Sequence, residues 1–262
     1  MNTEKVVAYI VDWLKDYAAK AGVNGFVVGI SGGIDSAVTS TLCAKTGFRV
    51  LCLEMPIHQA ASHVSRAQEH IAQLEKRFAN VDSRRVDLTP VFEEFKTEVT
   101  LEGKQETVDM ALANTRARLR MTTLYYHAGL YGLLVAGTGN KVEDFGVGFF
   151  TKYGDGGVDI SPIADLMKTE VRKIAVHLKV PQSIIDAAPS DGLFGDARSD
   201  EDQIGANYPE LEWAMTMKEA GKTIDDFDGR QKEVFEIFLK RNAANKHKME
   251  PIPVCIIPDG LK

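Results

Sequence analysis

Short apolar runs and amphipathic stretches alternate along the first hundred residues. Apolar runs at 26–30 and 48–55 each stop at a turn residue, and a shorter, less apolar run follows at 81–86. Between these runs, apolar residues recur at helical spacing, which predicts helices over 3–20, from 37 to near 47, over 58–78 and over 89–99. Strands and helices that alternate in this way form parallel sheets with right-handed crossovers. We therefore expect an α/β protein, a three-layer α/β/α sandwich with a central, mostly parallel sheet.

The second half of the chain is richer in helix. The stretch 108–131 is predicted to form a long helix that carries apolar residues on nearly every side, which is typical of a helix buried on both sides. A subunit interface is one way to arrange such burial. A strand at 132–137 and helices at 168–179, 210–220 and 224–244 follow. No repeat or linker composition divides the chain, so we expect a single domain over residues 1–262.

Polar stretches at 101–107, 149–161 and 188–206 are predicted to form loops. A loop as long as 188–206 is uncommon unless it has a function. Within it, Ser199 and Asp202 have the spacing of a capping box over a short helix. Whether 101–107 and 188–206 close over a ligand is left open by the sequence.

Composition is that of an ordinary globular protein. The 262 residues are 44% hydrophobic and 26% charged, with a net charge of −6. This balance does not favour a nucleic-acid partner, so an anionic ligand would need locally clustered Lys and Arg. The three cysteines lack metal or disulfide spacing, and Cys43 and Cys52 are expected in the core. Neither a basic leader nor a membrane-spanning run is found, so we expect a cytoplasmic protein.

A glycine-rich turn follows the first apolar run. Ser31-Gly32-Gly33-Ile34-Asp35-Ser36 joins that strand to a helix start, where converging backbone amides and the helix dipole favour an anion. The alternative is an ordinary βα turn that needs glycine to bend, and the full hexapeptide favours the nucleotide site. The Walker pattern is absent. The hexapeptide resembles the SGGxDS loop of N-type ATP pyrophosphatases, which cleave ATP between its α and β phosphates to adenylate a substrate.

A second block, Gly137-Thr138-Gly139-Asn140-Lys141-Val142-Glu143-Asp144, also begins where a strand ends. Its side chains should meet the first loop at the same edge of the sheet. Asp35 and Glu143 are then candidate Mg²⁺ ligands, because magnesium prefers one or two carboxylates together with phosphate and water oxygens. For Asp144, helix capping or solvation is the simpler interpretation.

A third block makes the resemblance specific. Residues 149–159, Phe-Phe-Thr-Lys-Tyr-Gly-Asp-Gly-Gly-Val-Asp, are followed by Ser-Pro-Ile-Ala-Asp-Leu-Met-Lys-Thr at 161–169. With the second block, this segment resembles the core of ammonia-dependent NAD⁺ synthetases. The resemblance runs from the first helix to His247-Lys248. It implies the adenine nucleotide alpha hydrolase-like, Rossmann-like fold.

The resemblance also implies roles for individual residues. ATP would contact Gly29, Ile30, Ser31, Gly32, Gly33, Ile34, Asp35, Ser36, Thr138, Lys168 and Ser190. Deamido-NAD⁺ would contact Arg118, Lys152, Asp159, His247 and Lys248. Mg²⁺ would bind Asp35 and Glu143, and the catalytic residues would be Asp35, Lys168 and Asp159. The segment 143–150 is one residue longer than the usual family form, so Asp144 is the alternative metal ligand.

Cations among these residues fit adenylation, in which an anionic acid must approach an anionic triphosphate. Arg116, Arg118 and Arg120 alternate along one predicted helix, so they cannot all face the ligand. Arg118 is expected at the ligand, and Arg116 or Arg120 in an ion pair or facing solvent. Five histidines lack metal-ligand spacing and are expected to be structural or exposed: His58, His63, His70, His127 and His177.

The expected activity is therefore Mg²⁺-dependent adenylation of deamido-NAD⁺ by ATP, followed by attack of ammonia to give NAD⁺, AMP and pyrophosphate. Free ammonia is expected because no cysteine has a nucleophile setting and no room remains for an amidase domain. Asp159 or Asp155 is a candidate base for ammonium. The family implies a homodimer. A tRNA-modifying adenylase and a non-catalytic adenine-nucleotide sensor are the rival interpretations. The first would need a basic face and often cysteine pairs, and the second predicts that ATP binding survives Asp35→Asn.

Overall fold

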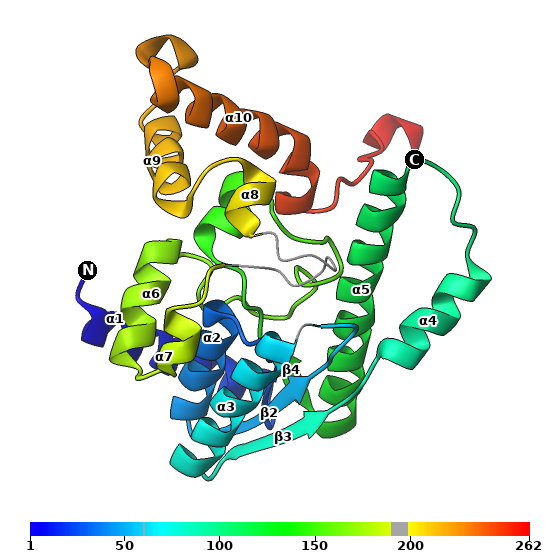
Figure 1. Ribbon diagram of the computed structural model, residues 1–262, viewed down its shortest axis with the longest axis vertical. Helices are drawn as coiled ribbons and strands as arrows, with labels where there is room; N and C mark the ends of the chain where they lie inside the picture. The colour runs from blue at the N-terminus through cyan, green and yellow to red at the C-terminus, as the bar shows by residue number, and fades with distance from the viewer. Residues whose placement is uncertain (60, 190–198) are drawn as a thin grey trace.

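The computed structural model describes residues 1–59, 61–189 and 199–262. Its centre is a parallel sheet in the order β3-β2-β1-β4. The strands are β1 (Gly25–Gly29), β2 (Arg49–Glu54), β3 (Val81–Arg85) and β4 (Leu133–Val135). Figure 1 shows helices packed around this sheet, with a further group of helices above its carboxyl edge. The predicted three-layer α/β/α architecture is confirmed.

Helices cover both faces of the sheet. One core cluster joins alternate strand residues such as Phe26 and Val28 to one helical layer, and another joins Val27 and Leu51 to the other. The first layer contains α1 (Thr3–Ala21), α2 (Ile34–Lys45), α3 (Ala61–Arg77), α6 (Lys168–His177) and α7 (Gln182–Ile185). The second contains α4 (Thr89–Glu98) and α5 (Gln105–Tyr131). Figure 1 shows the first layer to the left of the strands and the second, α4 and α5, to their right. β1 and β2 are buried on both faces and are therefore nearly continuous apolar runs in the sequence, whereas the edge strand β3 is largely exposed and polar.

A third cluster of apolar side chains lies above the carboxyl edge of the sheet. It is formed mainly by η1 (Val142–Val147), α9 (Tyr208–Glu219) and α10 (Gly229–Met249), with Leu211, Phe235 and Phe238 fully buried. The short elements α8 (Asp200–Ile204) and η2 (Ile224–Asp226) adjoin it. Figure 1 shows α8, α9 and α10 over the end of the sheet where the strands finish. These helices form a roof above the site region.

Helix boundaries follow local chemistry. Asn2 caps α1 by accepting the Lys5 N–H at 3.1 Å, and Gly22 ends that helix in the left-handed conformation. The predicted capping box at α8 is confirmed, because the hydroxyl of Ser199 accepts the Asp202 N–H at 3.1 Å. The last long helix begins at Gly229 and runs to Met249, several residues later than predicted, because Asp228 precedes it in extended conformation.

The start of α5 differs from the sequence expectation, and its burial on both sides is not tested by a single chain. The helix begins at Gln105, so it takes in part of the predicted loop 101–107. One side of the helix is exposed in the single chain, Tyr126 by 65% and Leu130 by 56%, so burial on both sides would need a second subunit. Its buried residues include the small side chains of Ala113, Ala117 and Ala128, which let the helix approach its neighbours closely. Leu112, Leu119, Leu124 and Tyr131 are partly buried against the same core.

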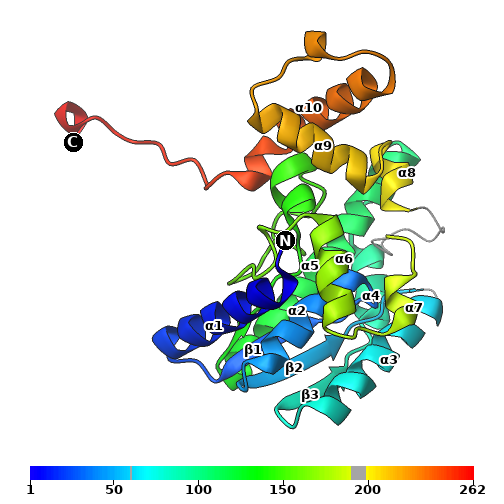
Figure 2. The ribbon, with the colours of Figure 1, turned by 90° about the vertical axis from the view of Figure 1, so that its left-hand side faces the viewer.

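The C-terminal stretch 251–262 extends away from the other elements, as Figure 2 shows, and ends in the single turn η3 (Asp259–Leu261). Its apolar side chains are exposed, Ile256 by 79%. In the part of the chain that the structure describes, no helix combines the length and hydrophobicity needed to cross a membrane.

Candidate active site

A cavity of about 610 Å³ opens at the carboxyl ends of the strands. Its floor is the turn between β1 and α2 and the segment that follows β4, and further walls come from the start of α6 and the start of α9. Every residue from Gly29 to Ser36 lines it, together with Thr138, Glu143 and Lys168. The edge of the sheet that the sequence analysis identified therefore carries the cavity.

The turn after β1 has a fixed shape in this structure. Gly32 has φ +80°, and a Cβ atom there would lie 2.5 Å from the carbonyl oxygen of His63. The buried hydroxyl of Ser36 donates to the carbonyl of Gly33 at 3.0 Å and accepts the Ser31 N–H at 3.3 Å. The hydroxyl of Ser31 accepts the Gly33 N–H at 3.2 Å. The turn is therefore held by its own serines, and only glycine fits at position 32.

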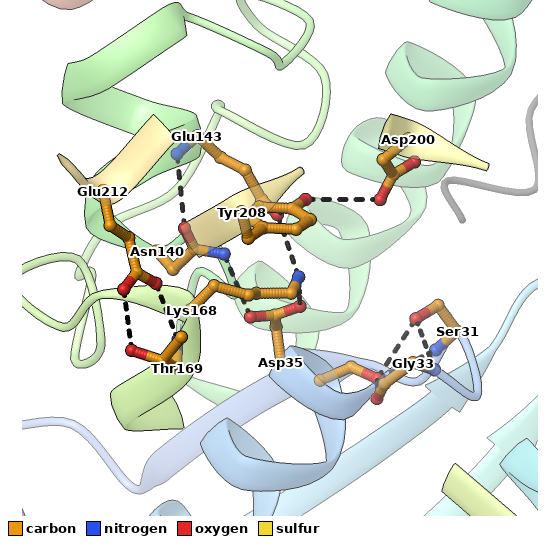
Figure 3. Close-up of polar contacts among 11 residues, drawn as sticks. Ser31, Gly33, Asp35, Asn140, Glu143, Lys168, Thr169, Asp200, Tyr208 and Glu212 are labelled. Atoms are coloured by element: carbon orange, nitrogen blue, oxygen red, sulfur yellow. Dashed lines mark hydrogen bonds and ion pairs between the residues drawn. The ribbon is translucent and has the colours of Figure 1, made fainter. Parts of the chain in front are cut away.

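Lys168 joins two carboxylates above this turn. Its Nζ lies 2.6 Å from Oδ2 of Asp35 and 2.9 Å from Oε1 of Glu143, and its side chain is only 11% exposed. Figure 3 shows the ammonium group between the two acids. Buried Asn140 connects the same pair, because its Nδ2 donates to Asp35 at 3.2 Å and its Oδ1 accepts the Glu143 N–H at 3.2 Å. The chain thus brings together residues that are distant in sequence.

The charges at this centre shift one another's pKa values. Burial alone would lower the pKa of Lys168, but Asp35 and Glu143 outweigh it and raise that pKa, so the ammonium persists. Burial raises the pKa of Asp35 against the opposing effect of Lys168. Burial acts on Glu143 in the same direction, but Lys168 and the hydroxyl of Tyr208 overcome it, and the pKa of Glu143 is lowered. Glu143 is therefore the more firmly ionised partner.

The roof contributes two residues that the sequence analysis did not single out. Tyr208 is buried, donates its hydroxyl to Oε1 of Glu143 at 2.5 Å, and has its ring 4.7 Å from Nζ of Lys168. Glu212, one turn later on α9, accepts both the N–H and the hydroxyl of Thr169. Both contacts are long range, and no local pattern in the sequence signals them.

Asp144 also lines the cavity, contrary to its expected role as a capping or solvated residue. Its carboxylate lies against Gly139, where a Cβ atom would be 2.2 Å from Oδ1 of Asp144. Burial, and then the nearby charges of Glu143, Asp155 and Asp35, raise the pKa of Asp144 to about 8. Its neighbours Val142–Val147 form a π-helix, which accommodates an extra residue relative to an α-helix. This agrees with the additional residue noted in 143–150.

Basic side chains line the cavity, although the sequence analysis did not assign them to it. Arg66 of α3 donates to the carbonyl of Gly32 at 3.2 Å, and His63 and Arg172 are also in the lining. Arg120 donates to the carbonyl of Met55 at 3.0 Å and lines the cavity. Arg120 therefore lines the cavity, although Arg118 was the arginine expected at the ligand and Arg116 or Arg120 in an ion pair or facing solvent.

Arg118 lies outside the cavity lining. It donates to the backbone carbonyl of Lys152, while Nζ of Lys152 donates to the carbonyl of His247 at 2.6 Å. Lys248 donates to the carbonyl of Phe150 at 2.6 Å. These predicted substrate contacts therefore gather where loop 149–159 meets the end of α10, beside the cavity. Ser190, predicted to contact ATP, lies outside the described residues.

Asp159 occupies a second hollow. Its two carboxylate oxygens accept the Tyr125 hydroxyl at 2.9 Å and the Val135 N–H at 2.8 Å. It lines a groove of about 430 Å³ together with Trp13, Tyr17 and Phe145. Asp155, by contrast, lines the main cavity and accepts the Thr151 N–H at 2.9 Å. The structure thus separates two carboxylates that the sequence analysis considered for one proton transfer.

The other assigned residues are structural. Cys43 and Cys52 are fully buried, as predicted, and burial raises the pKa of the Cys52 thiol to about 12. His70 is fully buried and its Nε2 lies 2.9 Å from the hydroxyl of Ser40. Burial lowers the pKa of His70 to about 4, so its imidazole is neutral at physiological pH.

The donors at the centre suit a hard cation. Asp35 and Glu143 present carboxylate oxygens to one point, and the Lys168 ammonium marks that point as favourable for positive charge. Among the described residues, no group of three or more His, Cys, Asp or Glu side chains is arranged to hold a metal. Two carboxylates completed by phosphate and water oxygens are the usual protein ligands of Mg²⁺, so the residues fit that ion.

A parallel sheet whose first βα turn carries the Ser-Gly-Gly-Ile-Asp-Ser hexapeptide, with a cavity lined by both acidic and basic side chains above it, is the arrangement of the PP-loop class of adenine-nucleotide-binding enzymes. The family model of NAD synthase matches residues 6–252 of the chain. The chain therefore belongs to the NAD synthase family, and is a ligase of NAD biosynthesis.

Individual relatives agree with this assignment. The NH(3)-dependent NAD(+) synthetase of Archaeoglobus fulgidus is 38% identical over 263 residues, covering 100% of each chain. The solved NMN synthetase of Francisella tularensis superposes with a TM-score of 0.84 at 31% identity, covering 99% of each chain. The NH3-dependent NAD synthetase of Campylobacter jejuni has a TM-score of 0.78 at 24% identity, covering 98% of this chain and 100% of that one, which supports the fold.

Proposed function

We propose that the chain converts deamido-NAD⁺ to NAD⁺, using ATP, Mg²⁺ and ammonia. The observation that carries this proposal is the convergence of the glycine turn, Thr138 and Lys168 on one cavity in a chain of the NAD synthase family. Backbone amides at a helix start and a buried ammonium are both suited to a polyphosphate. Ammonia and NAD⁺ come from the names of the full-length relatives.

The reaction would have two steps. A carboxylate oxygen of the nicotinate group attacks the α-phosphorus of ATP, and the bond to the β-phosphate oxygen breaks, releasing pyrophosphate. The lone pair of ammonia then attacks the acyl carbon, and AMP departs with the original carboxylate oxygen. One proton leaves the nitrogen. Asp155 is better suited to accept it than Asp159, because Asp155 lines the cavity and Asp159 lines the separate groove.

The chain's own contribution would be positioning and charge. Amides of the turn 31–36 would hold the phosphates, and Lys168 would offset the charge that grows on the departing pyrophosphate. Asp35 and Glu143 would hold Mg²⁺, which neutralises phosphate charge when bound. The Lys168 ammonium now spans these two carboxylates, so we expect it to turn toward the phosphates when the ion binds.

The deamido-NAD⁺ would lie across the two hollows. Its nicotinate end would reach the main cavity, and the remainder would pass Arg118, Lys152, His247 and Lys248. Asp159 would contact the dinucleotide in the second groove, where Trp13 and Tyr17 offer aromatic faces. Aromatic rings flanking a carboxylate suit a purine and its ribose hydroxyls.

We also propose that the protein is a cytoplasmic homodimer. Three large apolar side chains of α5, Met110, Tyr126 and Leu130, are exposed, and a second subunit is one way to cover them. The extended tail 251–262 adds more exposed apolar surface. Light scattering at micromolar concentration should give twice the mass of one chain. An active species with the mass of one chain would refute the dimer.

A second substrate is favoured by one comparison. The structurally similar Francisella tularensis protein is named an NMN synthetase, and its identity to this chain is 31%. A deamido mononucleotide presents the same nicotinate carboxylate and would react in the same cavity. It would lack the adenylate half, so it would leave the Trp13–Tyr17 groove empty.

The test supplies purified protein with ATP, Mg²⁺ and ammonium, and adds either deamido-NAD⁺ or nicotinate mononucleotide. Amidated product is followed by chromatography, and AMP and pyrophosphate are followed in parallel. We expect a higher kcat/KM for the dinucleotide and equal amounts of NAD⁺, AMP and pyrophosphate. A higher kcat/KM for the mononucleotide would identify nicotinate mononucleotide as the substrate instead. Folded protein that amidates neither compound would contradict the proposed function.

A further inference from the structure

Glu212 holds the first turn of α6 from a distant part of the sequence. The Thr169 N–H donates to Oε1 of Glu212 at 2.8 Å, and the Thr169 hydroxyl donates to Oε2 at 2.7 Å. Figure 3 shows this two-point contact on the side of the centre opposite the glycine turn. A carboxylate held by two donors has little rotational freedom, so the contact fixes where α6 begins.

The start of α6 matters because its first residue is Lys168. Thr169 directly follows it, so any shift at the Glu212 contact moves the origin of the lysine side chain. The preceding Met167 N–H is bonded to the carboxylate of Glu170 at 3.0 Å. The N–H groups of Met167 and Thr169 already donate to carboxylates and are not free to bind an anion. An anionic ligand at the start of α6 would therefore be bound mainly by the Lys168 ammonium.

A second residue of the same helix acts on the same centre. Tyr208 and Glu212 are four residues apart on α9 and therefore lie on one face. The Tyr208 hydroxyl donates to Glu143 at 2.5 Å, and its ring lies 4.7 Å from Nζ of Lys168. Two residues of α9 thus act on Lys168. Glu212 holds the backbone next to it through Thr169, and the ring of Tyr208 lies beside its ammonium group.

We infer that Glu212 is a positioning residue for Lys168 in the ATP-binding cavity. Glu212 itself does not line that cavity among the described residues, so it acts through Thr169 and Lys168. α9 also packs in the roof cluster with α10 and η1, and Glu212 is therefore the link by which the roof sets the position of a cation over the sheet. This inference rests on the proposed use of ATP.

The test compares ATP dissociation constants, measured by calorimetry without the second substrate. Glu212→Ala should weaken ATP binding about tenfold, in line with the loss of hydrogen bonds to a charged group. Glu212→Gln, which keeps one acceptor, should fall between this variant and the wild type. Glu219→Gln, at an exposed position near the end of the same helix, is the matched control and should bind ATP normally.

A double-mutant cycle distinguishes positioning from a general structural role. If Glu212 acts through the lysine, Glu212→Ala should change ATP affinity less than about twofold in a Lys168→Met background. An equal loss in both backgrounds, or a normal affinity for Glu212→Ala alone, would overturn the inference. If Glu212→Ala does not fold, Thr169→Val against Thr169→Ser repeats the comparison, because only valine removes the hydroxyl donor.

Failure of the proposed function would look different. Wild-type protein that binds ATP but forms no amidated product would refute the proposed reaction, yet the affinities of the Glu212 variants would still decide the positioning role. Turnover adds a further readout. Glu212→Ala should lower kcat/KM for ATP about tenfold and leave the KM for ammonium unchanged, because ammonia does not meet the phosphates.

Discussion

The floor and the roof of the cavity are built in different ways. The floor includes the glycine turn 31–36, whose shape is set largely by contacts among its own residues, such as the hydrogen bond from the Ser36 hydroxyl to the Gly33 carbonyl. The roof side chains, Tyr208 and Glu212, reach the centre only because the α9–α10–η1 cluster packs above the sheet. Substitutions in the floor, which is specified locally, should therefore cause large losses of ATP binding or turnover. Substitutions in the roof, which is held by packing, should cause smaller losses.

The largest effect is expected where the floor meets the charged centre. Asp35→Asn removes the charge that faces Lys168 and the proposed ion, so kcat should fall by about 100-fold or more. Asp225→Asn, at an exposed site in η2, should keep wild-type activity. Steady-state kinetics at varied Mg²⁺ measure both variants. Near-normal turnover of Asp35→Asn would contradict the metal assignment.

A second substitution tests whether the floor tolerates gradual change. Gly32→Ala combines φ +80° with a Cβ atom 2.5 Å from the His63 carbonyl, so the turn or α3 must move and ATP binding should weaken at least about tenfold. Gly221→Ala is the matched control, with φ +73° and nothing within 4 Å of the added atom. Both variants should lose about 1–2 kcal/mol of unfolding free energy from backbone strain. Equal ATP affinities for the two would refute a floor that requires glycine.

The roof should give a milder response. Tyr208→Phe removes the hydroxyl that donates to Glu143 but retains the ring beside Lys168. We expect kcat/KM for ATP to fall about tenfold or less, because one hydrogen bond to a charged group is lost. The melting temperature should change little. If Tyr208→Phe lowered activity as much as Asp35→Asn does, the floor and the roof would not differ in their sensitivity to substitution.

The smallest effect on turnover, and a clear one on stability, is expected beneath the floor at His70. Its folded pKa is lowered to about 4 from 6.5, so the unfolded chain binds the proton first as pH falls. The contribution of His70 to the free energy of unfolding should therefore be fully present above about pH 6.5. It should decline by roughly 3 kcal/mol as the pH falls toward 4. Urea unfolding at several pH values measures this. His70→Gln should flatten the decline, and exposed His177→Gln should retain it.

The same contrast explains what the sequence could predict. The floor residues from Gly29 to Ser36 were assigned correctly to the cavity because a strand, two glycines and a helix start lie next to one another in the chain. The order of strands and helices was also predicted correctly, because it depends on the local periodicity of apolar residues. Glu143 was expected at the same sheet edge because its block follows a strand, and Thr138 and Lys168 were assigned through the family resemblance; all three line the cavity.

The rest depended on tertiary packing. Tyr208 and Glu212 lie on a short helix with ordinary capping residues, and nothing local separates them from structural side chains. The place of Arg120 in the cavity lining was not predicted, because helical alternation shows that three arginines diverge but not which one faces inward. The apolar pattern of α5 could not say whether both of its sides are covered within one chain, and in the single chain Tyr126 and Leu130 are exposed.

The most direct test of the central claim follows an oxygen atom. Deamido-NAD⁺ labelled with ¹⁸O in the nicotinate carboxylate is incubated with ATP, Mg²⁺ and ammonium, and the AMP is examined by mass spectrometry. Adenylation in this cavity predicts one ¹⁸O atom in each AMP formed, because AMP departs with a carboxylate oxygen. Unlabelled AMP alongside NAD⁺ formation would contradict the account.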